Sequence, residues 1–179
     1  MLAFWDESGV SLLPQTRRTW APRGHTPVVR HHFSWKRANM ATALCYGTHG
    51  GTAQLVFHRQ ADAYDTDTLI GALTEFHRAL GGQKATLLWD GLPAHRSRKM
   101  RAWLGRQRRW LVVEPLPAYA PDLNPVEPLW ANLKGVELAN LAGDTIDHVT
   151  AAADRGIDRI RHAHHLAFSF LRHCGLSLW

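Results

Sequence analysis

An apolar run ends in a carboxylate at Phe4-Trp5-Asp6-Glu7, and the same arrangement returns at Leu88-Trp89-Asp90-Gly91. Short apolar runs of this kind are typical of buried strands, which we expect over Leu2–Trp5 and Ala85–Trp89. If these strands are adjacent and parallel, Asp6 and Asp90 meet at one end of a sheet. Active sites of open α/β sheets lie beyond the carboxyl ends of such strands. The pattern therefore predicts two carboxylates at one sheet edge.

The surrounding sequence predicts a mixed sheet with helices on both sides. We expect Gly9–Leu13 to form a return strand and Val28–Phe33 a short extended piece, and Gly50-Gly51 to close a hairpin. The strands at Leu2–Trp5, Ala85–Trp89 and Trp110–Val113 should be parallel, joined by right-handed crossovers. The hairpin strands are Ala38–Tyr46 and Ala53–His58, and helices are expected from Asp65 or Thr66 to Gly81, over Arg98–Gln107, from Asn124 onward with Pro125 in its first turn, and over Thr145–Arg161.

Asp6 and Asp90 have no obvious lysine partner, so their charges would repel each other. A hard cation such as Mg²⁺ would resolve that repulsion, because it prefers oxygen ligands. Glu127 offers a third carboxylate at the start of a helix. Each acid also has a structural interpretation: Asp90 as a strand-end cap, Glu127 as the third residue of a capping box with Asn124, and Asp122 as a turn residue.

Positive charge is unevenly distributed along the chain. Lys and Arg number 21 against 15 acidic residues, a net charge of +6, and 17 of the 21 are Arg. No acidic residue lies between Ser8 and Ala61, and seven of the fourteen residues from Arg96 to Arg109 are basic. Segregated positive charge indicates a polyanion such as nucleic acid, although a solvated basic face has the same composition. The candidate DNA-contacting residues are Arg17, Arg18, Arg23, Arg37, Arg106, Arg108 and Arg109, with Trp20 and Trp35 as possible base-stacking residues.

The composition is that of one globular domain, with 179 residues, 45% hydrophobic and 20% charged. We expect neither a secretory signal nor a membrane span, because no basic segment or long apolar segment follows Met1. Cys45 and Cys174 form no CxxC motif, which favours a reducing cytoplasm. The histidines near residues 162–173 lack a second ligand pair, so we interpret them as surface residues and not as a zinc site.

The segment Pro117–Trp130 resembles the signature around the third carboxylate of DDE-superfamily transposases, in their mariner-like bacterial insertion-sequence branch. Trp5-Asp6-Glu7-Ser8-Gly9 resembles the first-aspartate strand of that family. The segment Trp89–His95 resembles its second-aspartate motif, Asp-Asn-x-x-x-His. Arg18–Gly24 is similar to its Arg-x-Trp-x-x-x-Gly loop, and Phe168–Leu176 to its carboxyl-terminal end. The motifs occur in family order, and 36 residues separate Asp90 from Glu127.

This resemblance implies a ribonuclease H-like α/β fold, with a mixed five-stranded sheet flanked by helices, in one catalytic domain over residues 1–179. It implies that Asp6, Asp90 and Glu127 are catalytic and bind two Mg²⁺ or Mn²⁺ ions, which activate the attacking hydroxyl and stabilise the leaving oxygen. The implied reaction hydrolyses phosphodiester bonds at transposon ends and joins the 3′-hydroxyl to target DNA. The implied assembly is a homodimer on DNA, in the bacterial cytoplasm at the nucleoid. His95 is implied to lie near the site, as a DNA-phosphate contact or as a solvent-facing helix cap.

Two features depart from the family pattern. Gly91 stands where Asn is common, which removes a possible hydrogen bond beside the metal ions. Met1 is only five residues before Asp6, so we expect the family's amino-terminal helix-turn-helix region to be absent. The chain is then one product of a split or frameshifted gene whose partner product supplies that region, a truncated remnant, or a domain with a new task. The alternative functions are an inactive DNA-binding or assembly remnant of a transposase, and another ribonuclease H-like nuclease.

Overall fold

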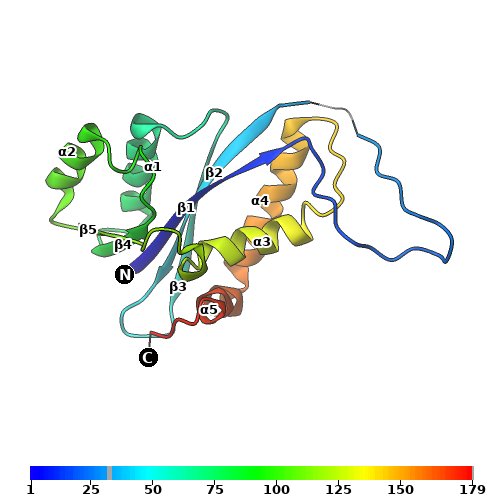
Figure 1. Cartoon of the computed structure of the whole chain (residues 1–179). Coiled ribbons are helices and arrows are strands. Elements are labelled where there is room, and N and C mark those ends of the chain that lie inside the picture. Colours follow the sequence, from blue (N-terminus) through cyan, green and yellow to red (C-terminus); the bar gives the residue numbers. More distant parts are fainter. Residues whose placement is uncertain (32–33, 179) are drawn as a thin grey trace.

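A five-stranded sheet with helices on both faces forms the body of the protein (Figure 1), seen in a computed structural model that describes residues 1–31 and 34–178. The strand order is β3-β2-β1-β4-β5. The strands are β1 (Leu2–Ser11), β2 (Arg37–Tyr46), β3 (Ala53–Gln60), β4 (Ala85–Trp89) and β5 (Leu111–Pro115). The helices are α1 (Thr66–Ala79), α2 (Arg98–Gln107), the 3₁₀ turn η1 (Pro121–Leu123), α3 (Val126–Val136), α4 (Ile146–His162) and α5 (His164–His173).

β1 is the central strand and pairs with one antiparallel neighbour and one parallel neighbour. It is parallel to β4, which is parallel to β5, so the predicted parallel set is confirmed. The predicted return strand over Gly9–Leu13 is wrong, because β1 continues without a turn to Ser11. Its ten residues pair antiparallel with β2, from Leu2 opposite Tyr46 to Ser11 opposite Arg37. The long partner strand keeps Gly9 extended, opposite Asn39.

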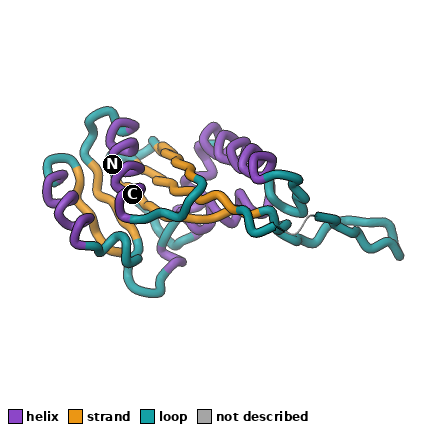
Figure 2. Tube along the Cα trace, turned by 90° about the horizontal axis from the view of Figure 1, so that it is seen from above, coloured by secondary structure: helices purple, strands orange, loops and turns teal. Residues whose placement is uncertain are grey.

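The pleat of the sheet divides the core into two layers, because successive side chains point to opposite faces. Phe4 of β1 packs into the layer formed with α3, α4 and α5. Trp5 packs into the opposite layer, formed with α1 and α2. The two layers lie on opposite sides of the sheet (Figures 1 and 2), as predicted. This alternation decides which face of the sheet receives Asp6 and which receives Glu7.

Local capping explains several helix boundaries. Asp65 and Thr68 form a reciprocal capping box at α1, and Ser97 and Thr145 accept backbone N–H groups at the starts of α2 and α4. The predicted helix over Arg98–Gln107 is confirmed. α5 was not predicted as a helix, although its apolar side chains follow a helical spacing. None of the helices in the described ranges is long and apolar enough to cross a membrane.

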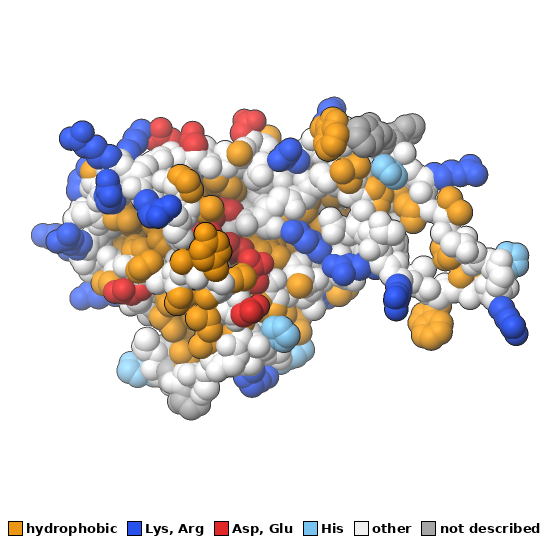
Figure 3. Space-filling model, in the orientation of Figure 1, with side chains coloured by type: hydrophobic (Ala, Val, Ile, Leu, Met, Phe, Trp, Pro, Cys, Tyr) orange, Lys and Arg blue, Asp and Glu red, His pale blue; other side chains and the backbone are white. Residues whose placement is uncertain are grey.

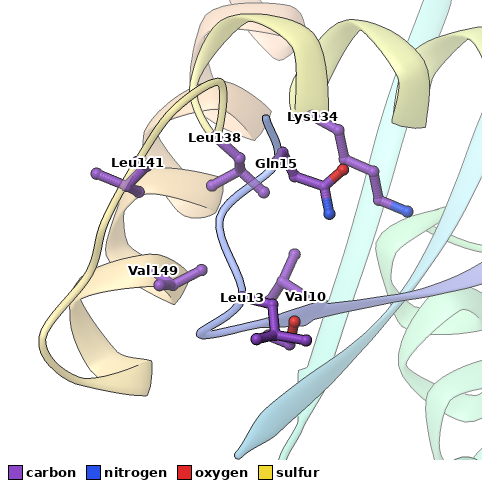
Figure 4. A pocket seen from close by; sticks show the side chains of 8 residues that line it. Val10, Leu13, Gln15, Lys134, Leu138, Leu141 and Val149 are labelled. Carbon is purple, nitrogen blue, oxygen red and sulfur yellow. The ribbon is translucent and has the colours of Figure 1, made fainter. Parts of the chain in front are cut away.

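Residues 12–31 and 34–36, the described part of the connection from β1 to β2, form an arm that extends away from the body (Figures 1 and 2). Its base is held by Asn140, which donates its N–H to the Gln15 carbonyl and accepts the Arg17 N–H at Oδ1, 2.9 Å away. Figure 4 shows Gln15 beside Lys134 and Leu138, and Leu13 beside Val10, around one pocket. Of the extended piece predicted over Val28–Phe33, residues 28–31 have no regular structure, and residues 32 and 33 lie outside the described residues.

Candidate active site

The register of β1 and β4 brings the first two predicted carboxylates to one sheet edge. Leu2 pairs with Thr86 and Phe4 with Leu88, so Asp6 and Asp90 each lie two residues beyond the last pair. Side-chain alternation places Asp6 on the face of Phe4, toward α3. The negative charges of Glu127, Glu7 and Asp90 all act on Asp6. The structure therefore groups Asp6, Asp90 and Glu127, which are 121 positions apart in sequence at their extremes.

Asp6 is a partly buried carboxylate in a negatively charged environment. The indole N–H of Trp130, on α3, donates to Asp6 Oδ2 over 2.9 Å. Burial first, and then the negative charges of Glu127 and Glu7, raise the pKa of Asp6 to about 7, although the Trp130 hydrogen bond acts to lower it. The ionised form of this carboxylate is thus disfavoured unless a positive charge is bound beside it.

Asp90 lies just after β4, where a turn leads into α2. Its Oδ1 atom accepts the Leu92 N–H at 3.1 Å and lies 2.9 Å from Nδ1 of His95. Burial acts to raise the pKa of Asp90, but the hydrogen bonds from His95 and Leu92, with the charges of His95 and Arg96, outweigh it and hold the pKa below its ordinary value. Asp90 does accept the turn hydrogen bond of a strand-end cap, and it also faces the carboxylate cluster.

Glu127 is exposed at the second position of α3, one position nearer the helix start than predicted. The expected capping box does not form: Asn124 is buried, accepts the Val126 N–H at 3.1 Å and donates to the Trp5 carbonyl at 3.3 Å. This amide fastens the start of α3 to the residue before Asp6. The capping interpretation of Glu127 is therefore wrong, and the side chain is left to face the cluster.

Lys134 is the cation that sequence reasoning missed. It lies two turns beyond Glu127 on α3, and its Nζ donates to Ser8 Oγ over 2.7 Å. Burial lowers the pKa of Lys134, while the negative charges of Glu127 and Asp6 act in the opposite direction. Residues 127, 130 and 134 share a helix face at i, i+3 and i+7. That spacing is the signal that could have placed this lysine beside β1.

His95 lies beside Asp90, near the site as the resemblance implies, and the solvent-facing cap is wrong. Its side chain is 1% exposed, and its ring stacks on Trp89 with a 4.0 Å centroid separation and a 1° interplanar angle. Nε2 lies 3.0 Å from Glu7 Oε1, and Nδ1 faces Asp90. Burial acts to lower the pKa of His95, but hydrogen bonds to Asp90 and Glu7 raise it to about 10. Both ring nitrogens are occupied by protein atoms.

Glu7 was quoted in the sequence motif but given no role. Because it follows Asp6 on a strand, it points to the α1/α2 face, where its Oε1 accepts the Trp5 indole N–H at 2.7 Å. Its other oxygen, Oε2, is buried without a hydrogen-bond partner within the described part of the chain. Glu7, Asp90 and His95 offer ligand atoms within 4.8 Å of one another.

The arginines predicted to contact DNA are exposed and form two separate groups. Arg17, Arg18 and Arg23 lie on the arm, with Arg37 at the start of β2, whereas Arg106, Arg108 and Arg109 lie at the end of α2. In the view of Figure 3, basic side chains lie at the end of the molecule that carries α2 and along the arm, and acidic side chains gather between these two regions. Trp20 and Trp35, the candidate stacking residues, are also exposed.

The sheet order and its flanking helices define a ribonuclease H-like fold. Residues 1–147 match the family described as DDE superfamily endonuclease, and the chain belongs to that family. No curated protein sequence matches the chain.

Solved structures of the same fold are similar at low sequence identity. The mariner Mos1 paired-end complex with Mg superposes with a TM-score of 0.66 and 18% identity, covering 97% of this chain and 53% of that one. The Mos1 catalytic domain gives a TM-score of 0.55 and 17% identity, covering 98% and 83%. A simian T-cell lymphotropic virus intasome gives 0.60 and 12%, covering 90% and 48%. The chain thus spans about half the length of the Mos1 chain in the paired-end complex.

Proposed function

We propose that this chain is the catalytic domain of a metal-dependent DNA transposase of the mariner-like bacterial insertion-sequence branch. Its reaction is hydrolysis of phosphodiester bonds at transposon ends, followed by joining of the 3′-hydroxyl to target DNA. The observation that carries the proposal is the convergence of Asp6, Asp90 and Glu127 from two parallel strand ends and a helix start. The Mos1 complexes contain Mg or Mn and transposon ends, which supports the same chemistry here.

The donor set fits divalent metal ions. Asp6 accepts the Trp130 N–H at Oδ2, and Asp90 Oδ1 contacts Leu92 and His95, so one oxygen of each carboxylate is left to bind a metal ion. Glu127 supplies a third, exposed carboxylate. Oxygen-only ligand sets suit Mg²⁺ and Mn²⁺, and two such ions bound there supply Lewis acidity at the phosphate and an activated hydroxyl. We propose that two ions bind, since three carboxylates offer more oxygens than one ion needs from the protein.

The remaining groups of the site have roles in this proposal that follow from their contacts. Trp130 and His95 hold the two aspartates in fixed orientations. Lys134 places a positive charge near Asp6 and Glu127, where it offsets part of their mutual repulsion in the absence of metal. The arm and the end of α2 contribute arginines for phosphate contacts, which position DNA without reading its sequence.

The test is a cleavage assay with Mn²⁺ on supercoiled DNA carrying the element's own terminal repeats, and on the same DNA with scrambled repeats. We expect weak nicking by the isolated chain on both substrates, because phosphate contacts carry no base information. Asp6→Asn, Asp90→Asn and Glu127→Gln should each abolish it, and Asp62→Asn, an exposed loop acid, should not. We propose that end recognition and homodimer pairing need a helix-turn-helix segment, which an added partner product would supply.

Three outcomes would overturn this proposal. Nicking that persists in all three carboxylate variants would place the chemistry elsewhere. DNA binding without any cleavage in Mn²⁺ would favour the second candidate, an inactive DNA-binding remnant, which the glycine at position 91 favours. Preference for RNA–DNA hybrids over duplex DNA would favour another ribonuclease H-like nuclease.

A further inference from the structure

A buried histidine connects two acidic residues, Glu7 of β1 and Asp90 in the turn after β4. His95 Nδ1 is 2.9 Å from Asp90 Oδ1 and 3.0 Å from the Asp90 carbonyl, and Nε2 is 3.0 Å from Glu7 Oε1. Every one of these partner atoms is a hydrogen-bond acceptor, so a ring that donates from both nitrogens satisfies the arrangement. The link joins residues 88 positions apart, from the central strand to the turn after β4.

Contacts at His95 and at Glu7 fix the orientation of both side chains. The His95 ring lies flat on Trp89, and its backbone N–H donates to the Leu92 carbonyl. At the other end, Glu7 Oε1 also accepts the Trp5 indole N–H at 2.7 Å. Trp5 and Trp89 are themselves buried. Neither the imidazole nor the Glu7 carboxylate can therefore rotate without breaking contacts in the α1/α2 layer of the core.

The Glu7 carboxylate is buried at a cost in stability that packing alone does not explain. Its side chain is 12% exposed, and Oε2 has no hydrogen-bond partner in the described residues. A buried carboxylate oxygen without a partner is destabilising, and an apolar side chain at this position would avoid that penalty. A role that requires an acceptor opposite His95 explains why an acid is present.

We propose that Glu7 and His95 are positioning residues that hold the Asp90 carboxylate for metal binding. Two donors, from His95 and Leu92, meet at Oδ1, and this leaves Oδ2 available as a metal ligand. Asp6 and Glu7 thus act as a pair on one strand: Asp6 enters the site directly, and its neighbour orients the other aspartate from the opposite face. This inference rests on the proposed function, because it takes Asp90 as a ligand.

Direct metal binding by Glu7 and His95 is the competing arrangement, since their ligand atoms and those of Asp90 lie within 4.8 Å. An ion there would bind one imidazole nitrogen and displace the hydrogen bond at that nitrogen, which is 2.9 Å at Nδ1 or 3.0 Å at Nε2. It would also have to reach a histidine side chain that is 1% exposed. The existing contacts favour positioning, and the experiment separates the two arrangements.

The experiment measures Mn²⁺ affinity of the 179-residue chain by electron paramagnetic resonance of free Mn²⁺, without DNA. His95→Phe keeps a flat ring on Trp89 but removes both N–H donors. The matched control is His77→Phe, because His77 stacks on Trp110 in the same way, at 3.9 Å and 5°. We expect His95→Phe to weaken Mn²⁺ binding by about 10- to 100-fold, with the control unchanged. Glu7→Gln, which keeps an acceptor oxygen, should weaken it less, and it serves as the deciding variant if His95→Phe does not fold.

Pulsed electron paramagnetic resonance of bound Mn²⁺ gives an independent result, because a histidine ligand produces a nitrogen coupling. We expect no such coupling in the parent protein. A nitrogen coupling, or parent-like Mn²⁺ affinity in folded His95→Phe and Glu7→Gln, would overturn the inference while Asp90→Asn still removes binding. If Asp6→Asn and Asp90→Asn also keep parent affinity, the proposed function itself fails.

Discussion

Replacing Asp6 by Asn should make the metal-free protein more stable at neutral pH. The pKa of Asp6 is raised to about 7 from 3.8, by burial first and then by Glu127 and Glu7. Between about pH 4 and pH 7 the folded protein therefore keeps a proton that the unfolded chain has lost, so this group makes stability fall as pH rises. Ionisation in the folded state costs on the order of 2–4 kcal/mol above that window. Asn carries no charge and retains an oxygen for the Trp130 N–H.

The assay is urea unfolding in EDTA at pH 5 and pH 8, followed by tryptophan fluorescence. The stability advantage of Asp6→Asn over the parent should increase from pH 5 to pH 8 and reach roughly 2–4 kcal/mol. Asp62→Asn, at an exposed loop position, should show no such increase. In Mn²⁺ at 100 times its dissociation constant the parent should gain about 2.7 kcal/mol, and the variant far less.

An Asp6→Asn protein that is less stable than the parent at pH 8 in EDTA would contradict this expectation. That outcome would mean that the carboxylate is stabilised by the fold, and that burial and neighbouring acids do not oppose its ionisation. An advantage that is the same at both pH values would show that packing, and not ionisation, explains it.

Four further predictions concern the elements that build and flank the site. Asn124→Ala should lower stability by about 1–3 kcal/mol in urea unfolding and weaken Mn²⁺ binding, because the Val126 N–H and the Trp5 carbonyl lose their buried partner. Unchanged stability and Mn²⁺ affinity would contradict the role of this amide in positioning α3. Gly156→Ala should lower stability by about 1–3 kcal/mol, because a β-carbon would collide with Leu133 Cδ1, whereas Gly105→Ala, with open space around it, should not. Gly91→Asn should fold normally, since a β-carbon there meets only the Arg96 guanidinium at 3.9 Å, and it should tighten Mn²⁺ binding in titration. A folding defect would contradict the expectation that position 91 has room for a side chain. Neutralising Arg106, Arg108 and Arg109 together should weaken binding to unrelated DNA sequences to the same extent. It should also reduce the slope of log affinity against log salt by about one for each phosphate contact that is lost, and an unchanged slope would mean that DNA binds to another surface.

Local sequence patterns were sufficient to predict most elements of the fold. Apolar runs marked β1 and β4, and the helical spacing of the apolar residues after Arg98 marked α2. The same runs ended in Asp6 and Asp90, so parallel pairing alone predicted their proximity. The return strand over Gly9–Leu13 failed for a physical reason: strand length depends on the available partner, and β2 offers ten residues for pairing.

The two strand-end aspartates, the Glu127 segment and the family motifs could be read from the chain alone, because each is encoded within a few neighbouring residues. How Asp6 and Asp90 are held could not, because it depends on contacts between distant segments. The hydrogen bonds from Trp130 to Asp6 and from His95 to Glu7 join residues 124 and 88 positions apart. Such contacts depend on strand register, on the face to which each side chain points, and on the seating of α3 by Asn124. Hydrophobic periodicity reports burial along one element and carries no information about which side chain of another element will meet it.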